Sequence, residues 1–168
     1  MNYSVVFSSR TGNTKMLADT VTSHLSGLDF IYTGIPADEA SEADFIFVGF
    51  WTDKGSCDNS ISNFLKNLEN KTVFLFGTAG FGGSSAYFNE ILTRVKAFLP
   101  SSCTAAGTYM CQGKMPESVR DRYETMLAGN PGDEKIQMMI ANFDAALSHP
   151  DHQDLENLKS ALDSLNLK

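Results

Sequence analysis

Short apolar runs alternate along the chain with segments in which apolar residues recur at helical spacing. Three of the runs, at 5–7, 45–48 and 73–76, contain no polar residue. A strand with one wet face alternates apolar and polar side chains, whereas a parallel strand covered on both faces is apolar throughout. These three runs therefore predict strands buried inside a parallel sheet.

The remaining pattern predicts an alternating order of strands and helices. Weaker runs at 30–32 and 103–110 predict two further strands. Apolar residues at helical spacing predict the helices between the strands, over segments 13–25, 61–68, 88–99 and 119–126. This alternation is typical of α/β proteins with right-handed crossovers, so we expect a doubly wound parallel sheet with helices on both faces.

The segment Gly129-Asn130-Pro131-Gly132 is the one strong break in the pattern. Beyond it, helical spacing predicts two more helices, over 136–147 and 155–165. The segment after the break is too short to form a second domain. We therefore expect one domain over residues 1–128 and a helical extension of the same domain over residues 129–168. This extension would be a helical hairpin packed on the sheet layer or a dimer contact, in a protein that is a monomer or a weak dimer.

Charge and length exclude several classes of partner. The chain has 168 residues, of which 20 are acidic and 13 basic, for a net charge of −7. Nucleic-acid binding requires a basic face, and anionic membranes attract basic segments, so neither partner is expected. No stretch approaches the roughly 18 apolar residues of a membrane-spanning helix. The acidic excess lies mostly outside the loops discussed below, on the predicted helices, where it would steer a basic redox partner.

Cysteine usage and the first residues indicate the compartment. The chain begins with a strand-like run and lacks the basic and apolar regions of a signal peptide. Its three cysteines, Cys57, Cys103 and Cys111, are odd in number and show no CxxC spacing. We therefore expect a cytoplasmic protein with reduced thiols.

The loop between the first strand and the first helix has the composition of an anion site. Residues 8–14, Ser-Ser-Arg-Thr-Gly-Asn-Thr, supply hydroxyl groups, an amide and a glycine at a helix N-terminus. Free backbone N–H groups and the helix dipole favour a phosphate there. The plainer alternative is a helix cap followed by a loop, but a cap needs only one such residue.

Other phosphate chemistries do not fit this loop. It lacks the GxxxxGK[ST] motif of P-loop NTPases, the GxGxxG motif of dinucleotide-binding folds, and the cysteine of a thiol phosphatase. The third strand ends in Val-Gly-Phe-Trp and not in the aspartate of a phosphoaspartate receiver.

The segment Ser9-Arg10-Thr11-Gly12-Asn13-Thr14 resembles the phosphate loop of flavodoxins, [TS]-x-T-G-N-T. The segments 49–55 and 77–82 stand where flavodoxins place the two loops that bind the flavin ring, and the resemblance covers roughly residues 2–128. It implies a flavodoxin-like five-stranded parallel sheet of order 2-1-3-4-5 and FMN as cofactor. The implied cofactor-binding residues are Ser9, Arg10, Thr11, Gly12, Asn13, Thr14, Phe50, Trp51, Thr52, Lys54, Gly55, Thr78, Ala79, Gly80, Phe81, Gly82 and Gly83.

Within the family, the motif Gly-Phe-Trp-x-Asp-Lys-Gly at 49–55, together with Cys-Gln-Gly-Lys at 111–114, resembles a subfamily of short flavodoxin-like proteins encoded in anaerobic bacteria. Some of its members are associated with bilirubin reduction. The resemblance therefore implies redox partner proteins, namely a reductase that donates electrons and an acceptor enzyme, with a bilirubin reductase as one candidate.

Individual residues of the two ring loops suggest specific roles. Trp51 and Phe81 are the aromatic residues best placed to stack on the ring, although each is also explained as ordinary packing. In flavodoxins, a peptide at the position of Lys54–Gly55 flips so that its carbonyl accepts a hydrogen bond from N5 of the reduced flavin, which requires a glycine. The Lys54 cation would make the flavin easier to reduce. Arg10 either neutralises the phosphate or is merely solvated.

Three further features favour structural explanations. Cys57, just past the second loop, is either a redox-sensitive thiol or an inert residue at a helix start, and we favour the latter. His149 and His152 have a metal-like spacing but no converging ligands. Met138 and Met139 fit core packing.

Three functions remain open. The first is an FMN-binding electron carrier between a reductase and a partner redox enzyme, because no acid, base or nucleophile constellation stands out and no catalytic or metal-binding residue is predicted. The second is an NAD(P)H-dependent quinone or flavin reductase on the same fold. The third is a flavin-free interaction module that retains the loop.

Overall fold

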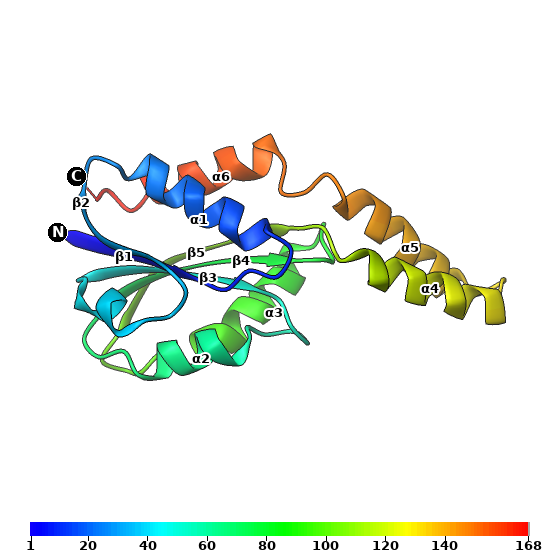
Figure 1. Cartoon of the computed structure of the whole chain (residues 1–168), viewed down its shortest axis with the longest axis horizontal. Coiled ribbons are helices and arrows are strands. Elements are labelled where there is room, and N and C mark those ends of the chain that lie inside the picture. The colour runs from blue at the N-terminus through cyan, green and yellow to red at the C-terminus, as the bar shows by residue number, and fades with distance from the viewer. Residues whose placement is uncertain (168) are drawn as a thin grey trace.

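The computed structural model describes residues 1–167. Its centre is a five-stranded parallel sheet of order β2-β1-β3-β4-β5, which confirms the expected doubly wound topology (Figure 1). The strands are β1 (Asn2–Phe7), β2 (Asp29–Gly34), β3 (Phe45–Trp51), β4 (Thr72–Ala79) and β5 (Thr104–Gln112). Because all strands run in the same direction, their carboxyl ends meet at one edge of the sheet.

Helices cover both faces of the sheet (Figure 1). On one face lie α1 (Asn13–His24) and α6 (His152–Asp163), and on the other lie α2 (Asn59–Lys66) and α3 (Ser85–Lys96). The short connection between β2 and β3 holds only a 3-10 helix, η1 (Asp38–Glu42). Within residues 1–167, no helix is long and apolar enough to cross a membrane.

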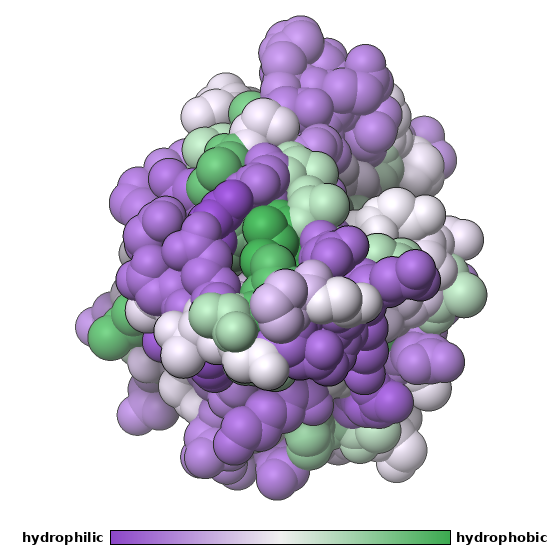
Figure 2. Space-filling view, turned by 90° about the vertical axis from the view of Figure 1, so that its right-hand side faces the viewer, coloured by the Kyte–Doolittle hydropathy of each residue, from purple (hydrophilic) through white to green (hydrophobic). Residues whose placement is uncertain are grey.

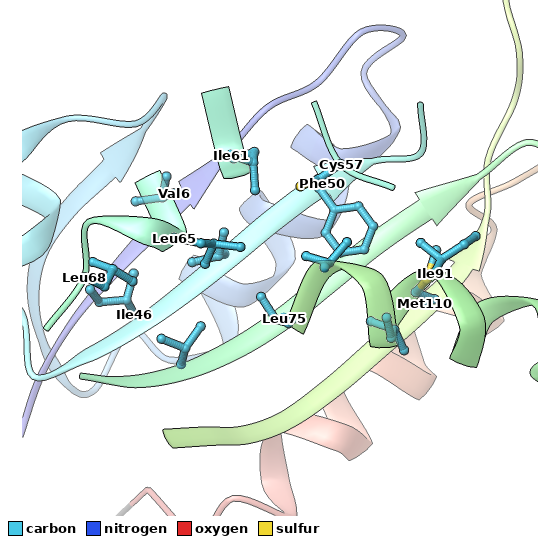
Figure 3. Packing of buried hydrophobic residues seen from close by; sticks show 14 of the residues in the cluster. Val6, Ile46, Phe50, Cys57, Ile61, Leu65, Leu68, Leu75, Ile91 and Met110 are labelled. Carbon is cyan, nitrogen blue, oxygen red and sulfur yellow. The ribbon is translucent and has the colours of Figure 1, made fainter. Parts of the chain in front are cut away.

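The central strands divide their side chains between two cores, as the apolar runs predict. Along β3, Ile46 and Phe50 face the core under α2 and α3, which Figure 3 shows with Ile61 and Leu65 packed against them. The intervening Phe47 faces the core under α1 and α6. Each of these β3 side chains is fully buried, and such burial stabilises a fold by roughly 1.5–3 kcal/mol per residue.

A helical hairpin leaves the sheet after β5. Its helices α4 (Glu117–Gly129) and α5 (Glu134–Ala146) pack on each other and project beyond the carboxyl edge of the sheet (Figure 1). Tyr123, Ile136 and Phe143 form a small core of their own between the two helices. Arg120 on α4 donates two hydrogen bonds to the Asp144 carboxylate on α5, at 2.9 and 3.1 Å.

The base of the hairpin is closed by the backbone. The amide of Lys114, just before α4, donates to the carbonyl of His149, just after α5, at 3.0 Å. The expectation that the two helices after residue 129 pair with each other is wrong, because α5 packs on α4 while α6 returns to the sheet. There Leu158 and Leu162 of α6 join the core under α1.

Candidate functional site

A cavity of about 360 Å³ opens at the carboxyl edge of the sheet, against α4. Figure 2 faces this end of the molecule and shows a hydrophobic strip between hydrophilic flanks. The three predicted loops contribute much of the lining. The predicted cofactor-binding residues that line the cavity are Arg10, Thr11, Asn13, Trp51, Thr52, Lys54, Gly55, Thr78, Ala79, Gly80 and Phe81.

Six of the predicted residues lie outside the cavity lining of the described chain: Ser9, Gly12, Thr14, Phe50, Gly82 and Gly83. Thr14 is fully buried, with its Oγ1 3.2 Å from Oγ1 of Thr78. The Phe50 ring belongs to the core under α2 and α3 (Figure 3). Ser9 Oγ accepts a hydrogen bond from the Lys15 amide at 3.3 Å. These residues lie in the loops or directly behind them and are not part of the cavity lining.

Where α1 begins, the first loop leaves the amides of Asn13 and Thr14 without a hydrogen-bond partner in the described chain, while the next amide, that of Lys15, donates to Ser9 Oγ. Gly12 occupies the N-cap position with φ of 89°, a left-handed conformation that favours glycine, and as a glycine it has no side chain with which to cap the helix. By contrast, the side chains of Asn13 and Thr11 donate to the Lys114 carbonyl, at 2.8 and 3.3 Å. This loop therefore offers an anion mainly backbone N–H groups and the helix dipole.

Trp51 ends β3 and lines the cavity in a fixed orientation. Its indole Nε1 donates to Ser8 Oγ and to Asp58 Oδ2, both at 3.2 Å. The Ser8 hydroxyl also donates to Asp58 Oδ2. The guanidinium carbon of Arg10 lies 5.5 Å from the centre of the indole ring, within cation–π range.

Asp58 holds this arrangement and also caps α2. Its Oδ1 accepts from the Ile61 amide at 3.0 Å and from Ser60 Oγ at 2.7 Å. Partial burial by itself would raise the pKa of Asp58, but hydrogen bonds from Ser8, Ser60, the Ile61 amide and Trp51 bring it below its ordinary value. The carboxylate is therefore held in its charged form.

The second loop closes in a tight turn. The amide of Asp53 donates to the Ser56 carbonyl at 2.7 Å, and the amide of Ser56 donates back at 3.1 Å. Lys54 and Gly55 both have positive φ, 50° and 81°, which is the pattern of a type I′ turn. Flipping the Lys54–Gly55 peptide would keep φ of Lys54 positive, reverse φ of Gly55 and give a type II′ turn, whose first central position is dominated by glycine. Lys54 therefore opposes the flip that the resemblance implies.

The third loop is held by the hairpin. The Gly80 carbonyl accepts hydrogen bonds from Gln112 Nε2 at 3.0 Å and from Asn142 Nδ2 at 3.1 Å. Gln112 Nε2 also donates to Asn142 Oδ1 at 3.1 Å, which joins β5 to α5. The Met115 side chain packs so closely on Gly80 that a Cβ there would lie 2.5 Å from it. Phe81 follows this clamp with 40% of its surface exposed.

The sequence did not predict the wall opposite the loops. It is formed by the turn after β5 and by α4, and its residues are Gly113, Lys114, Met115, Pro116, Val119, Arg122 and Tyr123. Asp53 and Tyr87 also line the cavity. The position of the turn at the carboxyl edge of the sheet was a usable signal, since ligands bind at that edge. The helical spacing of Val119 and Tyr123 predicts a buried face but not what the face covers.

The residues that surround the cavity fit an FMN molecule. A helix N-terminus with free amides suits the phosphate, and the aromatic side chains of Trp51, Phe81, Tyr87 and Tyr123 suit a flat ring. Gly113 contributes to this shape, because a Cβ there would collide with Asn13.

The other candidates have structural explanations, except that Met138, expected in the core, is exposed, while Met139 packs on the core between α4 and α5. Burial raises the pKa of the Cys57 thiol to about 11, which fits an inert residue. His149, Asp151 and Asp154 lie close enough together to hold a metal ion. However, Asp151 and Asp154 form the capping box of α6, and His149 Nδ1 lies 2.6 Å from Asp154 Oδ2. His152 is exposed on the first turn of α6.

Comparison with known proteins agrees with this geometry. A family model described as a flavodoxin domain matches residues 4–163, which extends well past residue 128. The chain is 40% identical to the flavodoxin-like domain-containing protein BilS of Clostridium symbiosum, over 92% of this chain and 90% of that protein. It is 32% identical to BilS of Clostridioides difficile, over 90% and 88%. The Streptococcus pneumoniae TIGR4 flavodoxin shares the fold, with a TM-score of 0.59, 19% identity, and coverage of 99% of this chain and 98% of that one. The chain therefore belongs to the flavodoxin family.

Proposed function

We propose that this protein binds FMN in the cavity at the carboxyl edge of the sheet and carries electrons between a reductase and a partner redox enzyme. The observation that carries the proposal is the joint placement of the free α1 N-terminus and the fixed Trp51 ring on one cavity. Bound FMN would supply one- and two-electron redox chemistry, while the protein would position the flavin and set the polarity and solvent exposure of its surroundings.

Each part of the cavity would have a distinct task. The amides at the start of α1 would hold the phosphate, with Thr11 and Asn13 fixing the loop against the Lys114 carbonyl. Trp51 and Phe81 would cover the ring and exclude water from it. Lys54 would place a positive charge beside it.

The names of the relatives support a narrower context. The matches to both BilS proteins cover most of this chain, and the motifs at 49–55 and 111–114 resemble those of proteins associated with bilirubin reduction. We infer that the acceptor is an enzyme of bilirubin reduction. Three free cysteines support a cytoplasmic location.

The visible spectrum of the purified protein and the mass of its released cofactor test the proposal. We expect a yellow protein that releases one FMN per chain and whose Trp51 fluorescence is quenched by the flavin. A colourless protein that takes up no FMN on titration would refute the proposal and favour a flavin-free interaction module. Rapid bleaching of the bound flavin by NADPH alone would instead favour a reductase.

A further inference from the structure

Four cationic side chains line the cavity, and each comes from a different part of the chain. They are Arg10 in the first loop, Lys54 in the turn after β3, Lys114 in the turn after β5, and Arg122 on α4. All four are exposed. Asp53 is the single carboxylate of the lining within the described chain.

This basic rim, defined as those four residues, contrasts with the rest of the molecule. The whole chain has 20 acidic and 13 basic residues, so a random patch is expected to be acidic. Elsewhere in the described chain, Lys15, Arg94, Arg120 and Lys159 pair with carboxylates, whereas the isolated cations Lys66, Lys71, Lys96 and Lys135 do not. The rim is therefore distinguished by its clustering on one cavity. Among residues 1–167, no rim cation has a carboxylate within 4.0 Å. The rim charges are therefore free to meet a ligand or a partner.

A bound phosphate group accounts for only part of the rim. A phosphate monoester carries about −1.5 to −2 charges, and the positive end of α1 already offsets about half a charge. With the phosphate and Asp53 both counted, the rim still carries a positive surplus. Arg122, on the wall opposite the first loop, belongs to this surplus because α4 and not the phosphate loop carries it.

We propose that the basic rim is the docking surface for a redox partner protein that presents carboxylates around its own electron-transfer site. This inference rests on the proposed function and names the chemistry of the partner. It reverses the expectation from net charge, under which acidic helices steer a basic partner. Opposite charges at the contact point accelerate the encounter of two proteins by about 10–10³-fold and fix their relative orientation. Salt screens the more distant charges of the molecule, so the charges nearest the contact dominate.

The first test uses Trp51, the only tryptophan in the sequence, on the flavin-free protein. Its fluorescence would be quenched with iodide or with caesium at constant ionic strength, each normalised to a free tryptophan amide. We expect iodide to quench about threefold more efficiently than caesium, because the rim concentrates anions. The double variant K54Q/R122Q should lose most of this preference. The matched variant K71Q, at the opposite end of β4, should keep it. Equal quenching by the two ions would overturn the proposal.

The second test uses the flavin-loaded, reduced protein. Its oxidation would be followed with hexacyanoferrate(III) and with hexaammineruthenium(III), each of which accepts one electron, so that two ions oxidise one fully reduced flavin. We expect the rate with the anionic oxidant to fall as salt is added and the rate with the cationic oxidant to rise. The reverse pattern would show that the net charge of −7 governs encounter and would overturn the proposal. Failure to bind FMN would refute the proposed function, whereas the iodide test still decides the charge of the rim.

Discussion

Replacing Asp58 by asparagine separates the two tasks of this side chain. Asparagine retains an oxygen that can cap α2 by accepting from the Ile61 amide at 3.0 Å and from Ser60 at 2.7 Å. Its amide nitrogen stands in place of Oδ2 and cannot accept from Trp51 or Ser8, so the indole loses its charged partner.

The expected size of the effect follows from these contacts. A hydrogen bond to a charged group contributes about 1.5–3 kcal/mol, and the half-buried Trp51 indole keeps Ser8 as an acceptor. We expect the free energy of unfolding to fall by about 2 kcal/mol. The affinity for FMN should also fall, because the indole ring is held less firmly against the flavin. We expect a loss of about 1.4 kcal/mol, which corresponds to a tenfold weaker affinity.

Two measurements check this prediction. Urea unfolding gives the change in stability, and the fluorescence anisotropy of Trp51 reports how firmly the indole is held. Asp29→Asn is the matched control, because it removes the same charge from an exposed position at the amino end of β2. If Asp58→Asn keeps the wild-type anisotropy and differs from the control by less than about 0.5 kcal/mol, Asp58 does not position Trp51.

Acid titration gives the same prediction a second readout. Because the pKa of Asp58 is lowered in the folded protein, its contribution is fully present above the ordinary aspartate pKa of about 3.9 and is lost as pH falls through the folded value. The stability difference between wild type and Asp58→Asn should therefore be constant near neutral pH and shrink below about pH 4. A difference that grows on acidification would contradict the assignment.

Other sites give independent predictions. Lys54→Gln should lower the flavin midpoint potential by roughly 20–60 mV in a potentiometric titration, since a cation stabilises reduced flavin, and an unchanged potential would refute this role. Asn142→Leu should weaken FMN binding several-fold in a fluorescence titration, because the Gly80 carbonyl loses one of its two donors; wild-type affinity would show that the clamp is dispensable. A thiol reagent at pH 8 should modify the half-buried Cys103 in the folded protein and Cys57 only after unfolding, and early loss of the Cys57 thiol by mass spectrometry would argue against its burial.

The sheet was predictable because its central strands carry the signal in every residue. The run at 45–48 is apolar throughout since Ile46 and Phe47 face opposite cores, so the pattern indicates both a strand and two covering layers. The first loop was equally accessible, because its motif is local and the helix N-terminus follows directly from it. In both cases neighbours in sequence determine the result.

The side-chain contacts that join the loops to the hairpin and to the turn before it were not predictable, because they link residues far apart in the sequence. Asn142 is a polar residue on a helix, and its acceptor on Gly80 lies 62 residues earlier in the chain. The side chain of Asn13 donates to the carbonyl of Lys114, 101 residues later, a contact that the loop motif does not indicate. Spacing shows that a helix has a buried face, but only the packed fold shows which loop a single amide reaches.

The backbone hydrogen bond between Lys114 and His149 has a consequence for how this protein can change. It brings the two ends of the α4–α5 hairpin together, at 3.0 Å from amide to carbonyl, while α6 packs on the sheet without it. A surface segment whose two ends lie side by side is one that tolerates insertion and deletion. Replacing the hairpin beyond Lys114 would therefore alter one wall of the cavity and remove the Asn142 contact to Gly80, while the sheet keeps its own contacts.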